Sequence, residues 1–388
     1  MSASVEHGHF DLAIMGGGLN GLTLAREMAR LGWKVALFER KEYPFHRVCG
    51  EYLSEEVRPI LDHLGYDVSR EAASIKRLEV SAPSGKTLRA DLPLGGLGIS
   101  RYRLDHQLAR AAQNAGAQLF TKTKVLDLQK AQGHWQVQTN RGVFASQHLV
   151  GSFGKRSNLD RTLNRAFLRK RSAFIGVKYH LTLDYPDDLI GLHNFPGGYA
   201  GVSRVEENRY CLCYLSRRAP LQERGSFEAL EREVLSQNPR IKALFENAEF
   251  LWDKPMVINE ISFAAKPLAQ EGMWFSGDAA GMIVPLAGNG MAMAMAGALL
   301  MAPRLNNVLR NKVTLEEAQL DYQRQWNQHF ALRLRFGRQL QRFFGQPRPT
   351  EWLVRSLSAL PHLMPALIKA THGKPESSQR LVKALPTP

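Results

Sequence analysis

The stretch Phe10–Gly21, which reads FDLAIMGGGLNG, decides the fold expected for this chain. Its first half is a short apolar run typical of a buried strand, and apolar residues at helical spacing follow over Leu19–Leu31. A glycine-rich turn between a strand and a helix lets the backbone approach a pyrophosphate closely and directs free amide groups toward it. Three glycines satisfy the G-x-G-x-x-G pattern of such a turn: Gly16, Gly18 and Gly21.

The residues after this turn complete a strand–helix–strand unit. Gly32 ends the helix, and Trp33–Phe38 is a second apolar run. Glu39 closes that run eighteen residues after Gly21, where a carboxylate can accept hydrogen bonds from ribose hydroxyls. We therefore predict a dinucleotide-binding site, although this unit alone does not distinguish FAD from NAD.

The pattern of elements changes twice along the chain. Helical spacing over Leu104–Ala115 belongs to a first α/β segment, whereas Ile175–Ser216 contains short strands joined by Pro, Gly and Asn turns. After Met273 a strand, a glycine turn and long helices return. We predict an α/β fold in which an antiparallel β-sheet interrupts a Rossmann-like domain. The expected parts are a discontinuous cofactor-binding domain at residues 1–160 and 255–345, an inserted substrate domain at residues 161–254, and a helical C-terminal tail at residues 346–388.

The composition is that of a folded soluble protein. Of 388 residues, 44% are hydrophobic and 22% are charged. The longest apolar run, near Ala292–Ala302, is too short to span a membrane, and the polar stretch Met1–His9 does not resemble a signal peptide. Three cysteines do not make a disulfide framework. We therefore expect a cytoplasmic protein, with attachment to the membrane periphery as an open alternative.

The formal net charge of +15 is concentrated near the C-terminus. Residues 301–388 contain 14 Lys and Arg against 5 Asp and Glu, which is a net charge of +9. Such a region could meet nucleic acid, an anionic membrane or an acidic carrier protein, or it could only keep a helical face solvated. Because no nucleic-acid-binding motif is present, we expect no nucleic-acid partner.

A second glycine turn distinguishes the two cofactors. Met273–Gly281 reads MWFSGDAAG and precedes a helix of small residues. It closely resembles the GD motif of the superfamily that contains aromatic hydroxylases (flavin monooxygenases) and geranylgeranyl reductases, and the whole resemblance covers about Asp11–Leu300. It implies FAD as cofactor, with Asp278 hydrogen-bonded to the ribityl chain. The alternative is a turn that only supports a core helix. The resemblance assigns these residues to the cofactor site: Gly277, Asp278, Pro285, Gly288, Asn289 and Gly290.

The same resemblance gives the helix after Gly290 a function. It implies that the helix directs its N-terminus at the pyrimidine edge of the flavin. Reduced flavin carries negative charge at that edge, and free amides at a helix N-terminus stabilise an anion. The resemblance also implies cofactor contacts for Arg40 and Val125.

Two further segments carry the resemblance. Arg101–Asp105, which reads RYRLD, is similar to an R-x-x-L-D helix opening and implies that Arg101 approaches the FAD phosphates. Asp105 has an alternative role as an acid favoured in the first helical turn. Pro44–Ser54, which reads PFHRVCGEYLS, is similar to the P-x-x-(K/R)-x-C-G-x-x-L segment of the reductase branch.

This segment supplies the candidate catalytic residue. The resemblance implies that Arg47 neighbours the cofactor and that Cys49 lines the site near the isoalloxazine ring. Cys49 is the one candidate for a catalytic side chain, although a lone cysteine is more often a small buried apolar residue than a reagent. We expect no metal site.

The chain also departs from its resemblance in three places. The D-G-x-x-S motif of the monooxygenase branch is replaced by Gly151–Ser157, which reads GSFGKRS and has Phe153 in place of the Asp, so hydroxylation is less well supported. The W-x-W-x-I-P motif of flavin halogenases is missing, which argues against chlorination. No second G-x-G-x-x-G follows, so NAD(P)H is expected to bind only transiently, unless another donor supplies the electrons.

Three functions remain open at this point. The favoured one is an enzyme that reduces or hydroxylates a hydrophobic molecule, such as an isoprenoid, a polyketide-like or an aromatic compound. The alternatives are an electron-transfer flavoprotein that delivers electrons to a quinone at a membrane, and a binding protein that has lost its flavin. The substrate pocket is expected between flavin and sheet, although aromatic residues in a sheet are more often core. Four residues are candidates for its lining: Phe195, Tyr199, Tyr210 and Tyr214.

The C-terminal stretch Trp352–Ala370 places apolar residues at near-helical intervals, with Pro361 and Pro365 between them and basic residues nearby. An apolar face with cations beside it fits attachment to anionic lipid. The alternative, which we favour, is that this face packs on the flavin domain and covers the substrate pocket.

Overall fold

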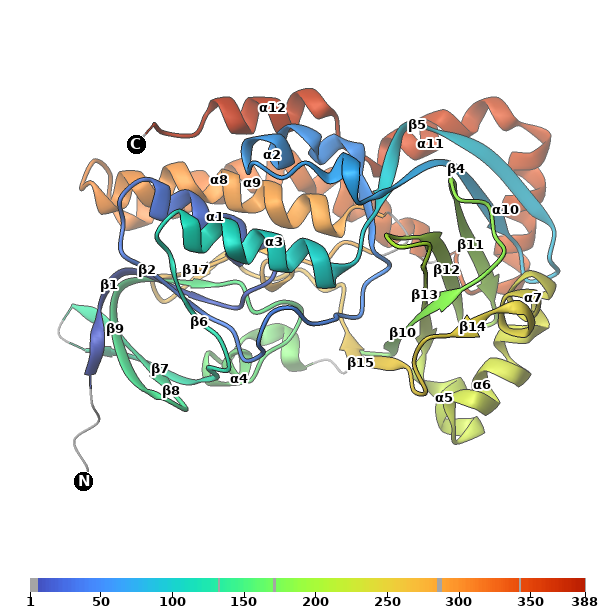
Figure 1. Ribbon diagram of the computed structural model, residues 1–388, viewed down its shortest axis with the longest axis horizontal. Coiled ribbons are helices and arrows are strands. Elements are labelled where there is room, and N and C mark those ends of the chain that lie inside the picture. The colour runs from blue at the N-terminus through green and yellow to red at the C-terminus, as the bar shows by residue number, and fades with distance from the viewer. Residues whose placement is uncertain (1–5, 132, 170–171, 285–287, 342, 388) are drawn as a thin grey trace.

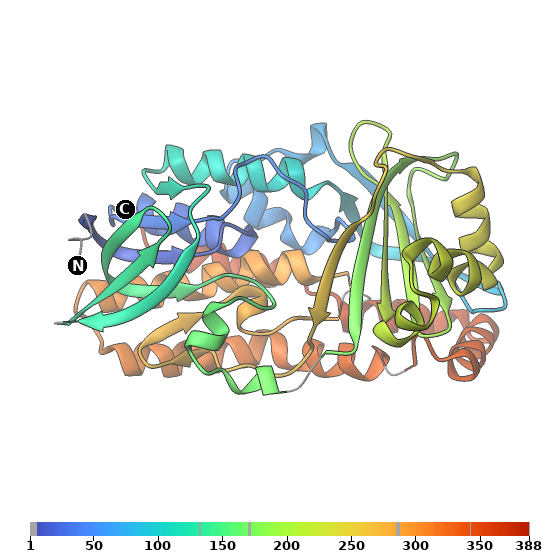
Figure 2. The same cartoon turned by 90° about the horizontal axis from the view of Figure 1, so that it is seen from below.

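The protein contains two β-sheets at opposite ends of an elongated molecule, with helices packed along both (Figures 1 and 2). The computed structural model describes residues 6–131, 133–169, 172–284, 288–341 and 343–387. The first sheet has the order β16-β17-β9-β1-β2-β6, and its neighbours β17, β9, β1, β2 and β6 pair in parallel. The bounds are β1 Glu6–Met15, β2 Val35–Phe38, β6 Gln118–Phe120, β9 Gly142–Gly151, β16 Ala269–Gln270 and β17 Met273–Phe275.

Four long helices cover this sheet and share its apolar core. α1 packs on α3 and α8 through buried Leu, Met and Ala side chains, and α8 packs on a mainly aromatic face of α9 that carries Tyr322, Trp326 and Phe330. A hairpin of β7 (Val125–Ala131) and β8 (His134–Thr139) extends the sheet beyond β9. This arrangement is the expected Rossmann-like domain. The helix bounds are α1 Leu19–Arg30, α3 Arg101–Asn114, α8 Gly290–Leu309 and α9 Leu315–Gln341.

The second sheet is larger than expected. Its order is β14-β10-β13-β12-β11-β4-β5-β3, with β15 paired to β10. Most pairs are antiparallel, but β11 and β4 run parallel. The bounds are β3 Tyr52–Ser54, β4 Ala73–Ser81, β5 Thr87–Gly98, β10 Phe174–Thr182, β11 Leu189–Phe195, β12 Gly198–Arg204, β13 Tyr210–Arg217, β14 Glu249–Phe250 and β15 Met256–Ile261.

This sheet corrects the expected extent of the substrate domain. The segment 161–254 contributes β10 to β14, but β3, β4, β5 and β15 come from outside it and belong to the same sheet. β5 is hard to recognise because Pro93, Gly95 and Gly96 interrupt it, and the pairing of β4 with β5 shifts register between Ile75 and Arg77. The cofactor domain and the substrate sheet are therefore interleaved along the chain at two places.

Helices cover both faces of the second sheet. α5, α6 and α7 lie along one face, where α6 and α7 contribute to a buried apolar cluster with β10, β12 and β13. The other face packs against α10 and α11, which contact β5. α12 instead lies on α2 and α8 of the first domain (Figure 1). The bounds are α2 Arg58–His63, α4 Leu159–Thr162, α5 Arg218–Arg224, α6 Phe227–Glu233, α7 Pro239–Asn247, α10 Pro347–Ala359, α11 Met364–Thr371 and α12 Pro375–Lys383.

The C-terminal helices are thus part of the fold, but α10 and α11 pack mainly on the second sheet, whereas the favoured interpretation placed the tail on the flavin domain. Among the described residues, no helix is both long and apolar enough to cross a membrane.

Candidate functional site

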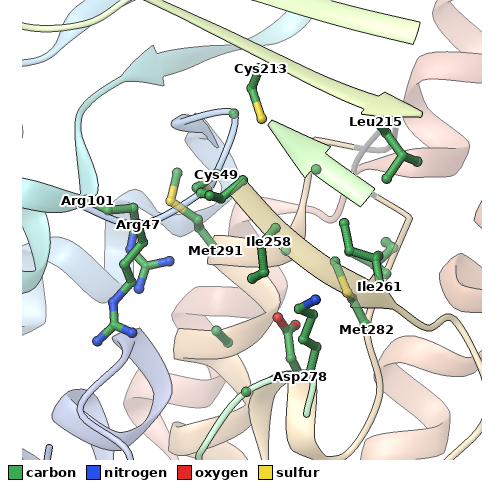
Figure 3. A pocket seen from close by; sticks show the side chains of 18 of the residues that line it. Arg47, Cys49, Arg101, Cys213, Leu215, Ile258, Ile261, Asp278, Met282 and Met291 are labelled. Carbon is green, nitrogen blue, oxygen red and sulfur yellow. The ribbon is translucent and has the colours of Figure 1, made fainter. Parts of the chain in front are cut away.

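A single large cavity runs from the glycine turn after β1 to the inner face of the second sheet. Its volume is about 980 Å³. In the close view, Arg47 and Arg101 lie on one side, Leu215 and Ile261 lie on the other, and Asp278 is below them (Figure 3). The cavity therefore joins a polar half in the first domain to an apolar half in the second.

The glycine turn packs closely against neighbouring backbone. Gly16 has φ 110°, and a Cβ there would lie 2.5 Å from the carbonyl oxygen of Ser152. A Cβ on Gly21 would lie 2.1 Å from the carbonyl oxygen of Gly16. Gly16 and Gly18 line the cavity, whereas Gly21 does not line it and instead permits close packing of α1 on the turn. The N-terminus of α1 thus faces the cavity at Gly18.

Glu39 closes the β2 end of the polar half. Its carboxylate accepts hydrogen bonds from the amides of Gly17 and Lys41, at 3.1 and 3.0 Å, and from Arg47 at 3.0 Å. Arg40 and Val125, both predicted to contact the cofactor, line the cavity beside it. This corner therefore presents a buried carboxylate next to the glycine turn.

Asp105 has a role beyond that of a first-turn acid. It is buried and holds two guanidinium groups, accepting from Arg47 at 2.7 Å and from Arg101 at 2.6 and 2.9 Å. Both arginines line the cavity. Two guanidinium groups close to a glycine turn at a helix N-terminus are groups that could hold a diphosphate.

Asp278 lines the floor of the cavity between two lysines. Burial raises the pKa of Asp278, and the positive charges of Lys266, Arg101 and Lys155 oppose that rise. Lys266 Nζ donates to the carbonyl oxygens of Lys155 and Asp278 at 2.6 and 2.8 Å. Burial lowers the pKa of both Lys155 and Lys266 to about 8.

Lys155 and Lys266 were not among the residues predicted for the site. Lys155 belongs to the glycine segment after β9 in which Phe153 replaces the Asp of the monooxygenase motif, and both residues line the cavity. Its position in that segment could have indicated it. Lys266 precedes β16 in an irregular stretch, and no pattern of the sequence distinguishes it.

The second glycine turn leads into α8 at the edge of the cavity. Gly277, Gly288, Asn289 and Gly290 line the cavity, and α8 begins at Gly290, so its N-terminal amides face the enclosed space. Such amides favour an anion. Pro285, which was assigned to the same site, lies outside the described residues.

The cysteines of the chain gather between the two halves of the cavity. Cys49 and Cys213 line it, and Cys211 Sγ donates to the carbonyl oxygen of Cys49 at 3.3 Å. Burial raises the pKa of all three thiols. A neutral thiol is a poor nucleophile, so the environment of Cys49 favours a lining role over covalent catalysis.

A buried ion cluster, which the sequence did not predict, fixes the segment that carries Cys49. Glu51 lies between Lys178 Nζ, at 2.5 Å, and His180 Nε2, at 2.6 Å, and both partners belong to β10. Glu51 also accepts from the amide of Arg101 at 2.8 Å. Burial alone would raise the pKa of Glu51, but Lys178 and His180 outweigh it and hold the pKa at about 2. The cluster therefore ties β10 to the polar half of the cavity.

The ligand atoms of His46, Glu51 and His180 lie within 4.8 Å of one another, a spacing that could hold a metal ion. Lys178, however, already places an ammonium group against Glu51. Burial and the charge of Lys178 lower the pKa of His46 to about 4. A second cation would meet this positive charge, so the cluster is balanced without a metal.

The apolar half of the cavity is a chamber between the second sheet and the C-terminal helices. Side chains of β4, β5, β11, β12 and β13 form one wall, and α10 and α11 form the other. We call this space the apolar chamber. Its lining includes Val80, Leu88, Leu192, Tyr199 and Leu215 from the sheet, and Leu353, Leu357, Met364, Leu367 and Ile368 from the helices.

Only Tyr199 of the four predicted lining aromatics belongs to the apolar chamber. Phe195 and Tyr210 do not line the cavity and are buried in the cluster on the opposite face of the sheet. Tyr214 borders the cavity, but its hydroxyl donates to Glu231 of α6 at 2.7 Å, so it also belongs to that opposite face. Strand residues alternate between faces, and β13 turns Cys213 and Leu215 toward the cavity instead. The sequence showed that side chains along these strands alternate between two faces, but it did not show which face of the sheet borders the cavity.

Comparison with known proteins decides the family. Residues 9–325 match the model of a protein family described as an FAD binding domain. The chain belongs to this FAD-binding family. Together with its relatives, this makes it an FAD-dependent oxidoreductase.

Three known proteins that this chain resembles each share less than a quarter of its residues over the aligned region. The chain is 24% identical over 360 residues to conditioned medium factor receptor 1 of Dictyostelium discoideum, covering 83% of this chain and 68% of the relative. It is 24% identical over 306 residues to digeranylgeranylglycerophospholipid reductase of Thermoplasma volcanium, covering 74% of this chain and 75% of the relative. The structure of the myxobacterial chondrochloren halogenase shares the fold, with a TM-score of 0.73 at 19% identity over 97% of this chain and 96% of the halogenase.

The polar half of the cavity fits the FAD that the family binds. The glycine turn and the cations held by Asp105 suit the diphosphate, Glu39 can accept from ribose hydroxyls, and Asp278 can accept from the ribityl chain. The N-terminus of α8 suits the flavin edge that becomes negative on reduction. The described residues of the polar half are therefore compatible with a bound FAD.

Proposed function

We propose that this FAD-dependent oxidoreductase reduces or hydroxylates a hydrophobic small molecule, with NAD(P)H as the transient reductant. One observation carries the proposal: the polar half of the cavity, which fits FAD, continues past Cys49 and Cys213 into the apolar chamber. A substrate in the apolar chamber would meet the cofactor without leaving the protein.

The lining of the apolar chamber indicates the substrate class. Leu, Val, Ile and Met side chains form most of both walls, and a long neutral molecule would bury apolar area against them. Polar side chains of its lining, such as Tyr199, Ser203, Thr350 and His372, lie among these apolar residues. Burial lowers the pKa of His372, so this side chain is neutral at physiological pH. An uncharged, mainly hydrocarbon substrate therefore fits better than an organic acid.

The chain contributes position, shielding and electrostatics to the reaction. FAD, when bound, supplies the hydride transfer or the oxygen chemistry. The α8 N-terminus would stabilise negative charge on a bound flavin, and the walls of the apolar chamber would exclude water from the reacting atoms. Cys49 stays a neutral thiol that shapes the junction.

Stopped-flow absorbance of the holoenzyme tests the proposal. We expect NADPH or NADH to bleach the flavin spectrum, and we expect a panel of isoprenoid and alkyl-aromatic compounds to change its reoxidation. Consumption of substrate without oxygen would indicate reduction, whereas product formation only with oxygen would indicate hydroxylation. Leu192→Trp, which fills the apolar chamber, should abolish the substrate effect and leave reduction by NAD(P)H intact. A panel in which no compound is converted, while a soluble quinone reoxidises the flavin rapidly, would favour the electron-transfer alternative.

A flavin-free binding protein is the remaining alternative, and it predicts a different preparation. We expect a yellow protein with one non-covalently bound FAD per chain, because the whole donor set for the cofactor is present. Acid precipitation should release the colour into the supernatant. A colourless protein that gains no flavin on incubation with FAD would instead support the flavin-free alternative.

A further inference from the structure

The outer surface of the C-terminal helices carries an unusual set of exposed side chains. Twelve large apolar side chains of the described residues are exposed, and four of them lie between residues 343 and 363. Their exposed fractions are 42% for Phe343, 65% for Trp352, 45% for Leu360 and 41% for Leu363. Exposed aromatic and leucine side chains that gather in one short segment indicate an interaction surface.

Packing within the protein explains the apolar side chains on only one face of α10. Leu353, Val354 and Leu357 line the apolar chamber, so burial accounts for them. At 100° per residue, Trp352 projects from the opposite side of the helix. The apolar chamber and the core do not require an indole there.

The charge around this segment is strongly one-sided. Residues 332–374 contain eight Lys and Arg and a single acid, Glu351, a net charge of +7. Arg348 and Arg355 lie one helical turn from Trp352 on the same outer face, and both are exposed. Arg355 is 4.0 Å from Glu351, and among the described residues no ion pair involves Arg348. The outer face of α10 therefore combines an exposed indole with cations in excess.

We propose that the surface formed by Trp352, Leu360, Leu363, Arg348 and Arg355 binds an anionic phospholipid bilayer. An indole and leucines insert among the headgroups and acyl chains, while nearby arginines attract anionic lipid. A second copy of the chain is a poorer match, because it would bring the same excess of positive charge to the interface. The surface lies at the end of the molecule remote from the N-terminus (Figure 1).

Attachment at this surface would place the apolar chamber beside the bilayer, since α10 and α11 are its wall. That consequence rests on the proposed function, because it concerns delivery of a lipophilic substrate. Bilayer binding itself does not depend on catalysis and can be measured separately.

Co-sedimentation of the holoenzyme with vesicles tests the proposal. We expect binding to vesicles of equal parts phosphatidylglycerol and phosphatidylcholine and weaker binding to pure phosphatidylcholine. In 0.5 M salt most of the binding should be lost, because the Debye length falls to roughly 4 Å and the attraction between the arginines and anionic lipid is screened. Arg348→Gln with Arg355→Gln should weaken binding roughly tenfold or more. Trp352→Ser with Leu360→Ser and Leu363→Ser should weaken it by a similar factor.

Matched controls separate this surface from general effects. Leu126→Ser, Leu251→Ser and Leu320→Ser remove three exposed apolar side chains elsewhere, and Arg110→Gln with Arg141→Gln removes two exposed cations elsewhere. Both controls should bind vesicles as the wild type does. FAD content and far-ultraviolet circular dichroism check the fold of each variant, and if the triple apolar variant does not fold, the arginine pair decides.

Three results would overturn the proposal. The first is absence of salt-sensitive binding to anionic vesicles. The second is equal weakening by the surface variants and their controls. The third is a wild-type protein that does not bind vesicles but sediments as a dimer, together with a Trp352→Ser variant that sediments as a monomer. That result would assign the surface to contact with a second copy of the chain.

Discussion

Asp278 shows at the scale of one residue how a local motif becomes a binding group. The turn Gly277–Asp278 follows a buried strand, and the fold places its carboxylate on the floor of the cavity near Lys155 and Lys266. A carboxylate held in this position can accept hydrogen bonds from hydroxyl groups of a bound molecule.

Asp278→Ala should weaken FAD binding by ~1.5–3 kcal/mol, because a charge-assisted hydrogen bond is lost. Titration of apoprotein by flavin fluorescence quenching measures this change. Asp253→Ala, at an exposed position, should bind FAD as the wild type does. Unchanged affinity in Asp278→Ala would contradict the ribityl contact.

Cys49 gives a second prediction at this scale. Because burial raises the pKa of its thiol, little thiolate is present at neutral pH. Iodoacetamide at pH 7.5 should therefore alkylate Cys49 in the native protein roughly tenfold more slowly than in the unfolded protein. Mass spectrometry of the peptide that contains Cys49 measures the rate. Rapid alkylation of Cys49 in the native protein would indicate that its thiol is largely ionised, which would favour a catalytic role for Cys49.

At the scale of elements, the cluster around Glu51 joins β10 of the second sheet to the segment that lines the cofactor site. Glu51 accepts from Lys178 and from the first amide of α3, so one carboxylate fixes a strand, a loop and a helix. Its position between two layers makes it a support for Cys49 and Arg47 and not a surface ion pair.

Glu51→Gln should destabilise the protein by about 3–5 kcal/mol, because Lys178 stays buried without its partner charge. Since the folded pKa of Glu51, about 2, lies below that of the unfolded chain, the wild-type contribution is complete above about pH 4.3 and is lost as the pH falls toward 2. Urea unfolding at pH 7 and pH 3 measures both effects. Glu246→Gln, in an exposed pair with Lys242, should change stability by less than about 0.5 kcal/mol. Equal stability of Glu51→Gln and wild type would exclude the supporting role.

At the scale of the whole molecule, the cavity exists because three parts meet. The first domain provides the cofactor half, the second sheet provides one wall of the apolar chamber, and α10 and α11 provide the other. The second sheet and helices α10 and α11 bury each other's apolar side chains, so the apolar chamber is complete only when both are present.

Removal of residues 347–388 should therefore expose one wall of the apolar chamber and cause aggregation. Soluble yield and binding of the dye ANS measure the effect. Removal of residues 386–388 alone, which takes away one hydrogen bond from Arg30 to the carbonyl oxygen of Pro386, should leave a soluble protein. If the protein truncated to residues 1–346 is soluble and does not bind ANS, α10 and α11 are not needed to cover the apolar chamber.

The sequence by itself determined the two glycine turns, the parallel order around β1 and the cofactor. These features are local: a backbone that must approach a phosphate or turn sharply excludes most residue types, and the constraint is visible in a few consecutive letters. Glu39 was recognised by its distance from the first turn, and the cysteine segment by the pattern of its own consecutive residues.

Only the tertiary structure decided the rest. The face of β13 that meets the cavity depends on strand register and not on residue type, so Tyr210 was assigned to the wrong side. The partners of Glu51 are 127 and 129 residues away along the chain, and β4 joins β11 across a similar distance. Pairing between distant segments is set by packing of the whole chain. The apolar chamber, which lies between one face of the second sheet and helices α10 and α11, depends on that packing.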